Sequence, residues 1–145
     1  MKLQESMNVY LANHQVMFIK LHNLHWNVRG VQFFALHSKF EEMYNSTADV
    51  IDDVAERILM IGGTPVASLA GALKIATIKE LESKTINGFD SLKVVLADIS
   101  ALIAQSLDIM KVAEKEGDQI TAEMFLDYTK EYQKLEWLIK AHIEQ

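Results

Sequence analysis

The chain has 145 residues, enough for one domain with a hydrophobic core, and half of its residues are hydrophobic, which excludes an intrinsically disordered chain. It has no cysteine, which excludes disulfides and thiolate metal sites, and its net charge of −6 argues against nucleic-acid binding through cationic contacts to phosphate. One proline, six glycines and little polar–apolar alternation predict a single all-α domain over residues 1–145. No signal peptide or apolar run of about 20 residues is present, so we expect a cytoplasmic protein without a membrane partner.

Apolar residues that recur at three- and four-residue steps predict four long helices. The first runs from about Leu3 to Val28 and ends at Gly30. The second runs from about Phe33 to Ile61 and ends at Gly62-Gly63-Thr64-Pro65. Its apolar stripe is predicted to be Leu36, Phe40, Tyr44, Thr47, Ile51, Ala55 and Ile58. The short turn makes the two helices antiparallel neighbours.

The connection that follows contains residues 66–78 (VASLAGALKIATI), which carry one charge and predict a short helix inside a long crossover. This segment either covers its own bundle or packs against another subunit, and both interpretations stay open. After a loop at residues 85–88, Asp90 is the expected N-cap of a third helix over about Ser91–Lys115. Asp118 is the expected N-cap of a fourth that ends near His142.

The inner face of the third helix is predicted to be Leu92, Val95, Ile99, Leu102, Ser106, Ile109 and Ala113. That of the fourth is predicted to be Ile120, Met124, Tyr128, Leu135, Leu138 and Ile139. Four long helices with one long crossover after the second are typical of the ferritin-like four-helix bundle, here with a short extra helix in the crossover between helices 2 and 3.

Two polar pairs with i,i+4 spacing, His37/Glu41 and Asp52/Glu56, lie on the second helix. At about 100° per residue, these side chains fall within an arc of about 100° beside the apolar stripe. Each pair alone is typical of a solvated helix surface, and Glu56 could simply pair with a nearby cation. Together with His25, which the short turn delivers near His37, they favour a metal site, because a bound metal offsets the cost of burying such groups. Mixed imidazole and carboxylate ligands suit Fe(II), Zn(II) or Mn(II) better than calcium.

The spacing of the two pairs bears on where a site can form. From His37 to Glu56 the chain advances by 19 residues, or roughly 28 Å along a helix, so no single metal ion joins both pairs within one chain. An isologous dimer, with the second helices antiparallel about a two-fold axis near residues 46 and 47, would build two equivalent inter-subunit sites. A di-iron site inside one bundle would need two Glu-x-x-His motifs, and the sequence contains none.

His14 precedes His25 by 11 residues, or roughly 16 Å along a helix, and His22 and His142 have no acidic partner at a spacing typical of a metal site. We expect all three to be structural or solvated. Trp26 is either a core residue or a residue whose backbone lies close to the site. Trp137 is expected in the core or at an interface.

The sequence over residues 23–65 resembles the Dps family, the mini-ferritins known as DNA-binding proteins from starved cells, and the resemblance extends over essentially the whole chain. The motifs that carry it are His25-Trp26-Asn27-Val28-Arg29-Gly30, Phe33-Phe34-Ala35-Leu36-His37, Phe40-Glu41-Glu42-Met43-Tyr44, Asp52-Asp53-Val54-Ala55-Glu56-Arg57-Ile58 and Gly62-Gly63-Thr64-Pro65. The resemblance implies a hollow homododecamer that oxidises Fe(II), typically with hydrogen peroxide, at ferroxidase centres on its two-fold interfaces. It also implies that Fe(III) mineral is stored in the cavity, which protects against oxidative stress.

The resemblance also implies a ligand set for iron. His25, His37 and Glu41 would come from one subunit, and Asp52 and Glu56 from its partner. Many relatives carry aspartate where this chain has Glu41. Trp26 would lie beside the centre and quench one-electron oxidants.

Members of the family that bind DNA commonly use lysine-rich tails, whereas this sequence has only Lys2 before its first helix. We therefore do not expect DNA binding, and the alternative is a non-enzymatic DNA-compacting protein with the same shell. Asp118, Glu123 and Asp127, at the start of the fourth helix, either complement the helix dipole or, by resemblance, line a pore through which Fe(II) enters.

Overall fold

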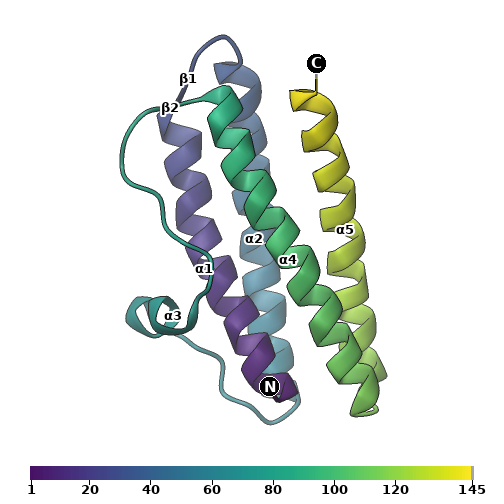
Figure 1. Ribbon diagram of the computed structural model, residues 1–145. Coiled ribbons are helices and arrows are strands. Elements are labelled where there is room, and N and C mark those ends of the chain that lie inside the picture. The colour runs from purple at the N-terminus through teal and green to yellow at the C-terminus, as the bar shows by residue number, and fades with distance from the viewer. Residues whose placement is uncertain (145) are drawn as a thin grey trace. The chain divides into compact units, whose positions relative to one another are not determined.

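The computed structural model describes residues 1–144 (Figure 1). Its elements are α1 (Leu3–Asn27), β1 (Val28–Arg29), α2 (Phe33–Met60), α3 (Leu69–Ile75), β2 (Ile86–Asn87), α4 (Gly88–Lys115) and α5 (Gln119–Ile143). The four predicted long helices are confirmed, each end lying within three residues of its expected position. Within residues 1–144, no helix combines the length and apolarity needed to cross a membrane. The chain divides into two compact units, residues 7–91 and residues 1–6 together with the chain from Leu92 onward.

The first unit is built on the antiparallel hairpin of α1 and α2 (Figure 1). The turn between them uses Gly30 at φ 116°, a conformation that side-chain-bearing residues rarely adopt. The buried face of α2 consists of Leu36, Phe40, Met43, Thr47, Val50, Val54 and Ile58. Tyr44, Ile51 and Ala55, which were expected in this stripe, are only half-buried. Met43, Val50 and Val54, each one residue earlier in the chain, are buried in their place, and Tyr44, Ile51 and Ala55 flank the core on the side of the acidic pairs.

The crossover between α2 and α4 runs along α1, and polar side chains of α1 bind its backbone (Figure 1). The predicted short helix is present as α3, and Ser68 caps it by accepting a hydrogen bond from the Gly71 backbone N–H. This helix leaves Leu69 and Leu73 exposed. The bonds that hold the crossover have donor–acceptor distances of 2.6–3.3 Å and join Asn8 to Thr64 and Val66, Asn13 to Thr77 and Ile78, Lys20 to Lys79, and Asn23 to Leu81 and Glu82.

A two-residue parallel pairing of β1 with β2 joins the end of α1 to the beginning of α4, with Val28 opposite Ile86 and Arg29 opposite Asn87. The prediction of Asp90 as N-cap of this helix was wrong. Asn87 takes that role, because its Oδ1 accepts the Asp90 backbone N–H at 2.9 Å, and α4 therefore begins three residues earlier. The expected loop at residues 85–88 contains β2, which is too short to leave a periodic signal.

The second unit contains the antiparallel hairpin of α4 and α5 (Figure 1). Gly117, at φ 78°, ends α4, and the predicted cap Asp118 accepts hydrogen bonds from the Thr121 N–H and hydroxyl. Every residue predicted on the inner face of α4 is buried. The prediction for α5 was partly wrong, since Ile120 and Leu138 are exposed. The buried residues of α5 are Thr121, Ala122, Phe125, Tyr128, Thr129 and Ile139.

Candidate metal centre

His25, in the last turn of α1, and His37, in the second turn of α2, face each other across the hairpin turn. Their rings stack with centroids 3.7 Å apart and planes 12° from parallel. Each Nδ1 lies 2.7 Å from the backbone carbonyl oxygen of the other residue. A carbonyl oxygen only accepts, so each Nδ1 carries a proton, and in the neutral ring Nε2 keeps its lone pair. Both imidazoles are therefore held in the tautomer that ligates a metal through Nε2.

Glu41 lies one turn after His37, and its carboxylate oxygen is 3.8 Å from the Nε2 of His25. The histidine ring is buried, whereas the Glu41 side chain is 55% exposed. The structure thus brings together His25, His37 and Glu41, as the spacing predicted. Two imidazole nitrogens and a carboxylate at the surface are a donor set that suits Fe(II).

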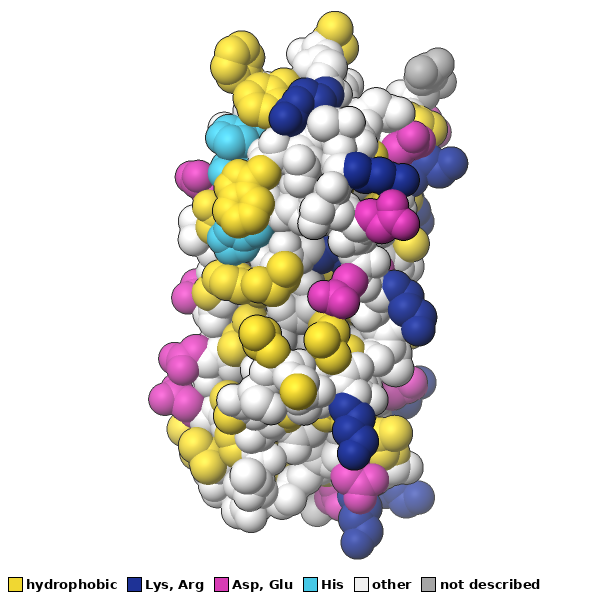
Figure 2. All heavy atoms as spheres, turned by 90° about the vertical axis from the view of Figure 1, so that its left-hand side faces the viewer, with side chains coloured by type: hydrophobic (Ala, Val, Ile, Leu, Met, Phe, Trp, Pro, Cys, Tyr) yellow, Lys and Arg dark blue, Asp and Glu magenta, His cyan; other side chains and the backbone are white. Residues whose placement is uncertain are grey.

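An aromatic group formed by Tyr44, His22 and Trp26 adjoins these three residues, and of these only Trp26 was expected beside the site. Tyr44 meets the His25 ring edge-on at 5.4 Å, and His22 stacks on Tyr44 at 3.7 Å. Trp26 lies 5.4 Å from the His22 ring, and Figure 2 shows histidine side chains at the surface beside hydrophobic ones. Trp26 is 62% exposed, so its interpretation as a core residue was wrong. The signal for Tyr44 was available in its spacing, since it lies three residues after Glu41 on the same helix face.

Tyr44 follows Glu41 by three residues on α2 and is half-buried. Partial burial and the negative charge of Glu41 raise the pKa of Tyr44 above its ordinary value of 10.0. The hydroxyl therefore stays protonated throughout the physiological pH range.

Asp52 and Glu56 form a second cluster on α2, joined by Asp53, which was not predicted. One carboxylate oxygen from each lies within 4.8 Å of the others, and all three side chains are exposed. Asp52 and Glu56 follow His37 by 15 and 19 residues, roughly 22 and 28 Å along the helix. Within one chain the structure does not bring this cluster to the histidine pair.

The other singled-out residues have local roles. His14 is fully buried, its Nδ1 is hydrogen-bonded to the Tyr10 carbonyl, and burial lowers its pKa to about 4, so the structural interpretation is confirmed. His22 is half-buried with its Nδ1 bonded to a backbone carbonyl, and His142 is exposed. Trp137 is 64% exposed and is not a core residue of the chain. Glu123 and Asp127 are exposed on α5.

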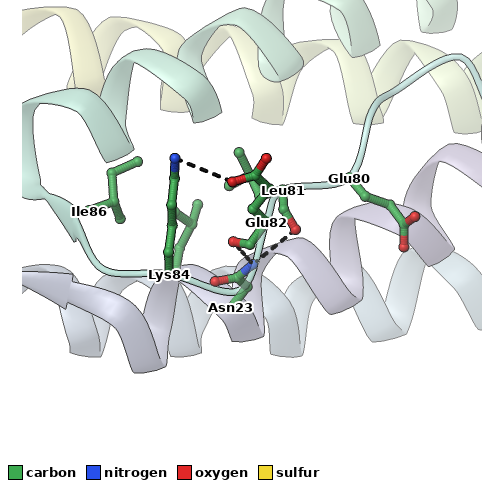
Figure 3. Close-up of a pocket in the computed structure, with 7 residues that line it drawn as sticks. Asn23, Glu80, Leu81, Glu82, Lys84 and Ile86 are labelled. Carbon is green, nitrogen blue, oxygen red and sulfur yellow. Dashed lines mark hydrogen bonds and ion pairs between the residues drawn. The ribbon is translucent and has the colours of Figure 1, made fainter.

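A groove of about 280 Å³ lies between α1 and the crossover (Figure 3). Three of its lining residues are engaged with one another, because Lys84 Nζ pairs with Glu82 at 3.3 Å and Asn23 donates to the Leu81 and Glu82 carbonyls. None of the histidines lines it. The lining residues are Asn23, Leu24, Glu80, Leu81, Glu82, Lys84 and Ile86.

Comparison with known proteins gives a consistent result. The family model of the ferritin-like domain matches residues 4–145. DNA protection during starvation protein 2 of Bacillus anthracis is 38% identical over 142 residues, which cover 97% of this chain and 96% of that protein. The crystal structure of a Dps protein from Bacillus brevis superposes with a TM-score of 0.95 at 37% identity, covering 98% of this chain and 95% of that one.

A Dps protein from Vibrio cholerae O1, described as a member of a broad superfamily of ferritin-like diiron-carboxylate proteins, superposes with a TM-score of 0.94. It is 39% identical, and the match covers 98% of this chain and 89% of that one. These matches confirm the predicted fold class, the ferritin-like four-helix bundle with a short helix in its crossover.

Proposed function

This chain belongs to the Dps family of ferritin-like proteins, and from that premise we propose that it is a cytoplasmic mini-ferritin that oxidises Fe(II) and stores Fe(III) mineral inside a homododecameric shell. The whole chain then acts as one domain. Iron is the substrate and cargo of this activity. The observation that carries the proposal is the reciprocal hydrogen bonding of His25 and His37, which leaves two Nε2 lone pairs beside the Glu41 carboxylate.

The proposed centre is shared between two subunits. His25, His37 and Glu41 of one subunit would bind iron together with the partner's Asp52 and the partner's Glu56. The separation of His37/Glu41 from Asp52/Glu56 along α2 supports this arrangement. If the α2 helices of two subunits pack antiparallel about a two-fold axis near residues 46 and 47, the first pair of each subunit lies opposite the second pair of the other. The mixed nitrogen and oxygen donor set supports iron over calcium.

The proposed oxidant is hydrogen peroxide. One peroxide molecule accepts two electrons, one from each of two Fe(II) ions, and with two protons it leaves as two molecules of water. This reaction consumes both Fe(II) and hydrogen peroxide, the two reagents that together form hydroxyl radical. This supports a role in protection against oxidative stress. Bound iron supplies the electrons, and the chain's part is to hold two ions close together and to orient the ligand nitrogens of His25 and His37 through their Nδ1 hydrogen bonds.

The proposal is tested by loading the assembled protein with Fe(II) under anaerobic conditions, adding peroxide or oxygen, and following the absorbance of Fe(III). The Asp52→Ala/Glu56→Ala variant should lose rapid oxidation while its circular dichroism spectrum stays helical. The matched control, Glu42→Ala/Asp49→Ala, removes two other exposed acids of α2 and should behave as the parent does. An Asp52→Ala/Glu56→Ala variant that oxidises iron at the parental rate would refute the ligand assignment.

Several relatives are named for the protection of DNA. For this chain we propose protection through removal of iron and peroxide, since a net charge of −6 disfavours contacts to phosphate. Gel retardation of duplex DNA at neutral pH, at low and at moderate salt, should show no shift. A shift that disappears as salt rises would instead favour the DNA-compacting alternative.

A further inference from the structure

Phe33, the first residue of α2, lies one turn before His37 on the same side of the helix. Its ring stacks on the His37 ring with centroids 5.0 Å apart and planes 21° from parallel. The His25 ring also stacks on the His37 ring, with centroids 3.7 Å apart and planes 12° from parallel. Two rings at these distances would overlap if they shared one face of the imidazole, so Phe33 and His25 cover its opposite faces.

The turn between α1 and α2 fixes the place of Phe33. Its backbone N–H donates to the Gly30 carbonyl oxygen at 3.1 Å, and Gly30 has the φ of 116° that lets the chain reverse there. Phe33 is half-buried, whereas the next side chain, Phe34, is 84% exposed. Of the two neighbouring phenylalanines, the turn therefore directs Phe33 toward the histidine pair.

His37 is the imidazole of the pair that most needs such support. His25 is buried, whereas His37 is only half-buried. The torsion that turns a histidine ring about its Cβ–Cγ bond has broad minima, so the single hydrogen bond from Nδ1 leaves the ring plane loosely defined. Rings packed on both faces narrow this range, because a turn of the imidazole would separate the stacked surfaces. A ligand that acts well must be held within about 10–20° of its productive direction.

We propose that Phe33 is a positioning residue that holds the His37 ring against His25 and so keeps the His37 Nε2 aimed at the metal. This inference rests on the proposed function, since it takes His37 as a metal ligand. Metal affinity falls in proportion to the fraction of time that a ligand spends in its binding orientation. The energy of one aromatic pair is enough to change that fraction about two- to tenfold.

The test measures binding of Co(II), which does not undergo the oxidation, to the assembled protein by calorimetry and by the visible absorption of the bound ion. Phe33→Leu keeps an apolar side chain that suits a helix but removes the flat ring. It should weaken Co(II) binding about two- to tenfold and change the absorption spectrum at saturation, because this spectrum depends on the arrangement of the ligands. Phe33→Tyr, which keeps the ring, should bind Co(II) as the parent does.

Phe34→Leu is the matched control. It makes the same change one residue later, in an exposed ring that meets the Phe33 ring edge-on at 5.8 Å, and it should keep the parental affinity and spectrum. If Phe33→Leu does not assemble, Phe33→Met takes its place, since methionine is apolar and flexible and has no flat ring.

The outcomes separate this inference from the proposed function. Parental affinity and spectrum in Phe33→Leu would overturn the positioning role and leave the proposed function in place. An equal loss of affinity in Phe33→Tyr or in Phe34→Leu would overturn it as well, because the effect would then not depend on a ring stacked on His37. Failure of the parent to bind Co(II) at all would overturn both.

Discussion

His25 and His37 hold one another in place, because the Nδ1–H of each ring donates to the backbone carbonyl oxygen of the other residue at 2.7 Å. The two rings also stack at 3.7 Å, so neither can turn without breaking a contact made by the other. The end of α1 and the beginning of α2 therefore present the two Nε2 atoms as one unit.

This mutual dependence predicts non-additive losses. His25→Ala and His37→Ala should each lower Co(II) affinity by at least about 100-fold, because each removes a ligand and the hydrogen bond that orients the other ligand. The double variant should lose clearly less than the sum of the two single losses in free energy. Additive losses, measured by calorimetry on folded assemblies, would show that the two rings act independently.

Mixing subunits tests whether the centre is shared. Neither a His25→Ala/His37→Ala chain nor an Asp52→Ala/Glu56→Ala chain should oxidise Fe(II) rapidly alone. In a mixed dimer, one of the two sites keeps every ligand and the other loses both sets, so co-assembled shells should recover part of the activity. Shells proved by mass spectrometry to be mixed, yet inactive, would favour sites contained within single chains.

The attachment of the crossover to α1 predicts a large effect at Asn13. Its side chain is fully buried, accepts the Thr77 and Ile78 backbone N–H groups at 2.7 and 3.0 Å, and donates to the Thr77 hydroxyl at 2.9 Å. Asn13→Ala should lower the free energy of unfolding by about 2–4 kcal/mol, since it leaves backbone donors unsatisfied. The exposed Asn45→Ala should cause no loss, and equal guanidinium midpoints for the two variants would contradict the assignment.

The burial of His14 predicts a dependence of stability on pH. Burial lowers its pKa from 6.5 to about 4, so the unfolded chain binds a proton more readily than the folded one. The contribution of this shift to the free energy of unfolding is about 3 kcal/mol. It is fully present above pH 6.5 and is lost as pH falls through 4. Guanidinium midpoints at fixed protein concentration should fall less steeply between pH 6.5 and 4 for His14→Gln, which stays uncharged, than for the parent. Parallel curves would show that His14 does not contribute.

The acidic start of α5 predicts an effect on iron entry. Asp118 serves as the helix cap, which leaves the exposed Glu123 and Asp127 available to attract cations. Glu123→Gln/Asp127→Asn should slow iron uptake most at low ionic strength, because salt screens the attraction of a charged opening for its counter-ions. The oxidation centre should keep its Co(II) affinity. If the variant takes up iron with the parental rate and salt dependence, these residues only complement the dipole of α5 and play no part in iron entry.

Long periodic helices could be predicted from the sequence because their apolar residues repeat over many turns, and glycine and aspartate mark their ends, as at Gly117 and Asp118. The grouping of His25 with His37 also followed from sequence, since a short turn brings neighbouring helix ends together. The burial of Met43 in place of Tyr44 on α2 could not be predicted, because adjacent residues on both edges of the stripe are apolar. Asn87 was missed as a cap because Asp90 is an equally good capping residue and only the backbone decides between them.

The bonds from α1 to the crossover have a consequence for the exchange of amide hydrogens with solvent. The N–H groups of Val66, Thr77 and Ile78 lie outside every helix and strand, yet each donates to an asparagine side chain that is anchored on α1. Their exchange with deuterium then requires the crossover to lift from the helix, which also breaks the bonds of its neighbours. These three amides should therefore exchange as slowly as helical ones, although nothing in their local conformation sets them apart from an ordinary loop.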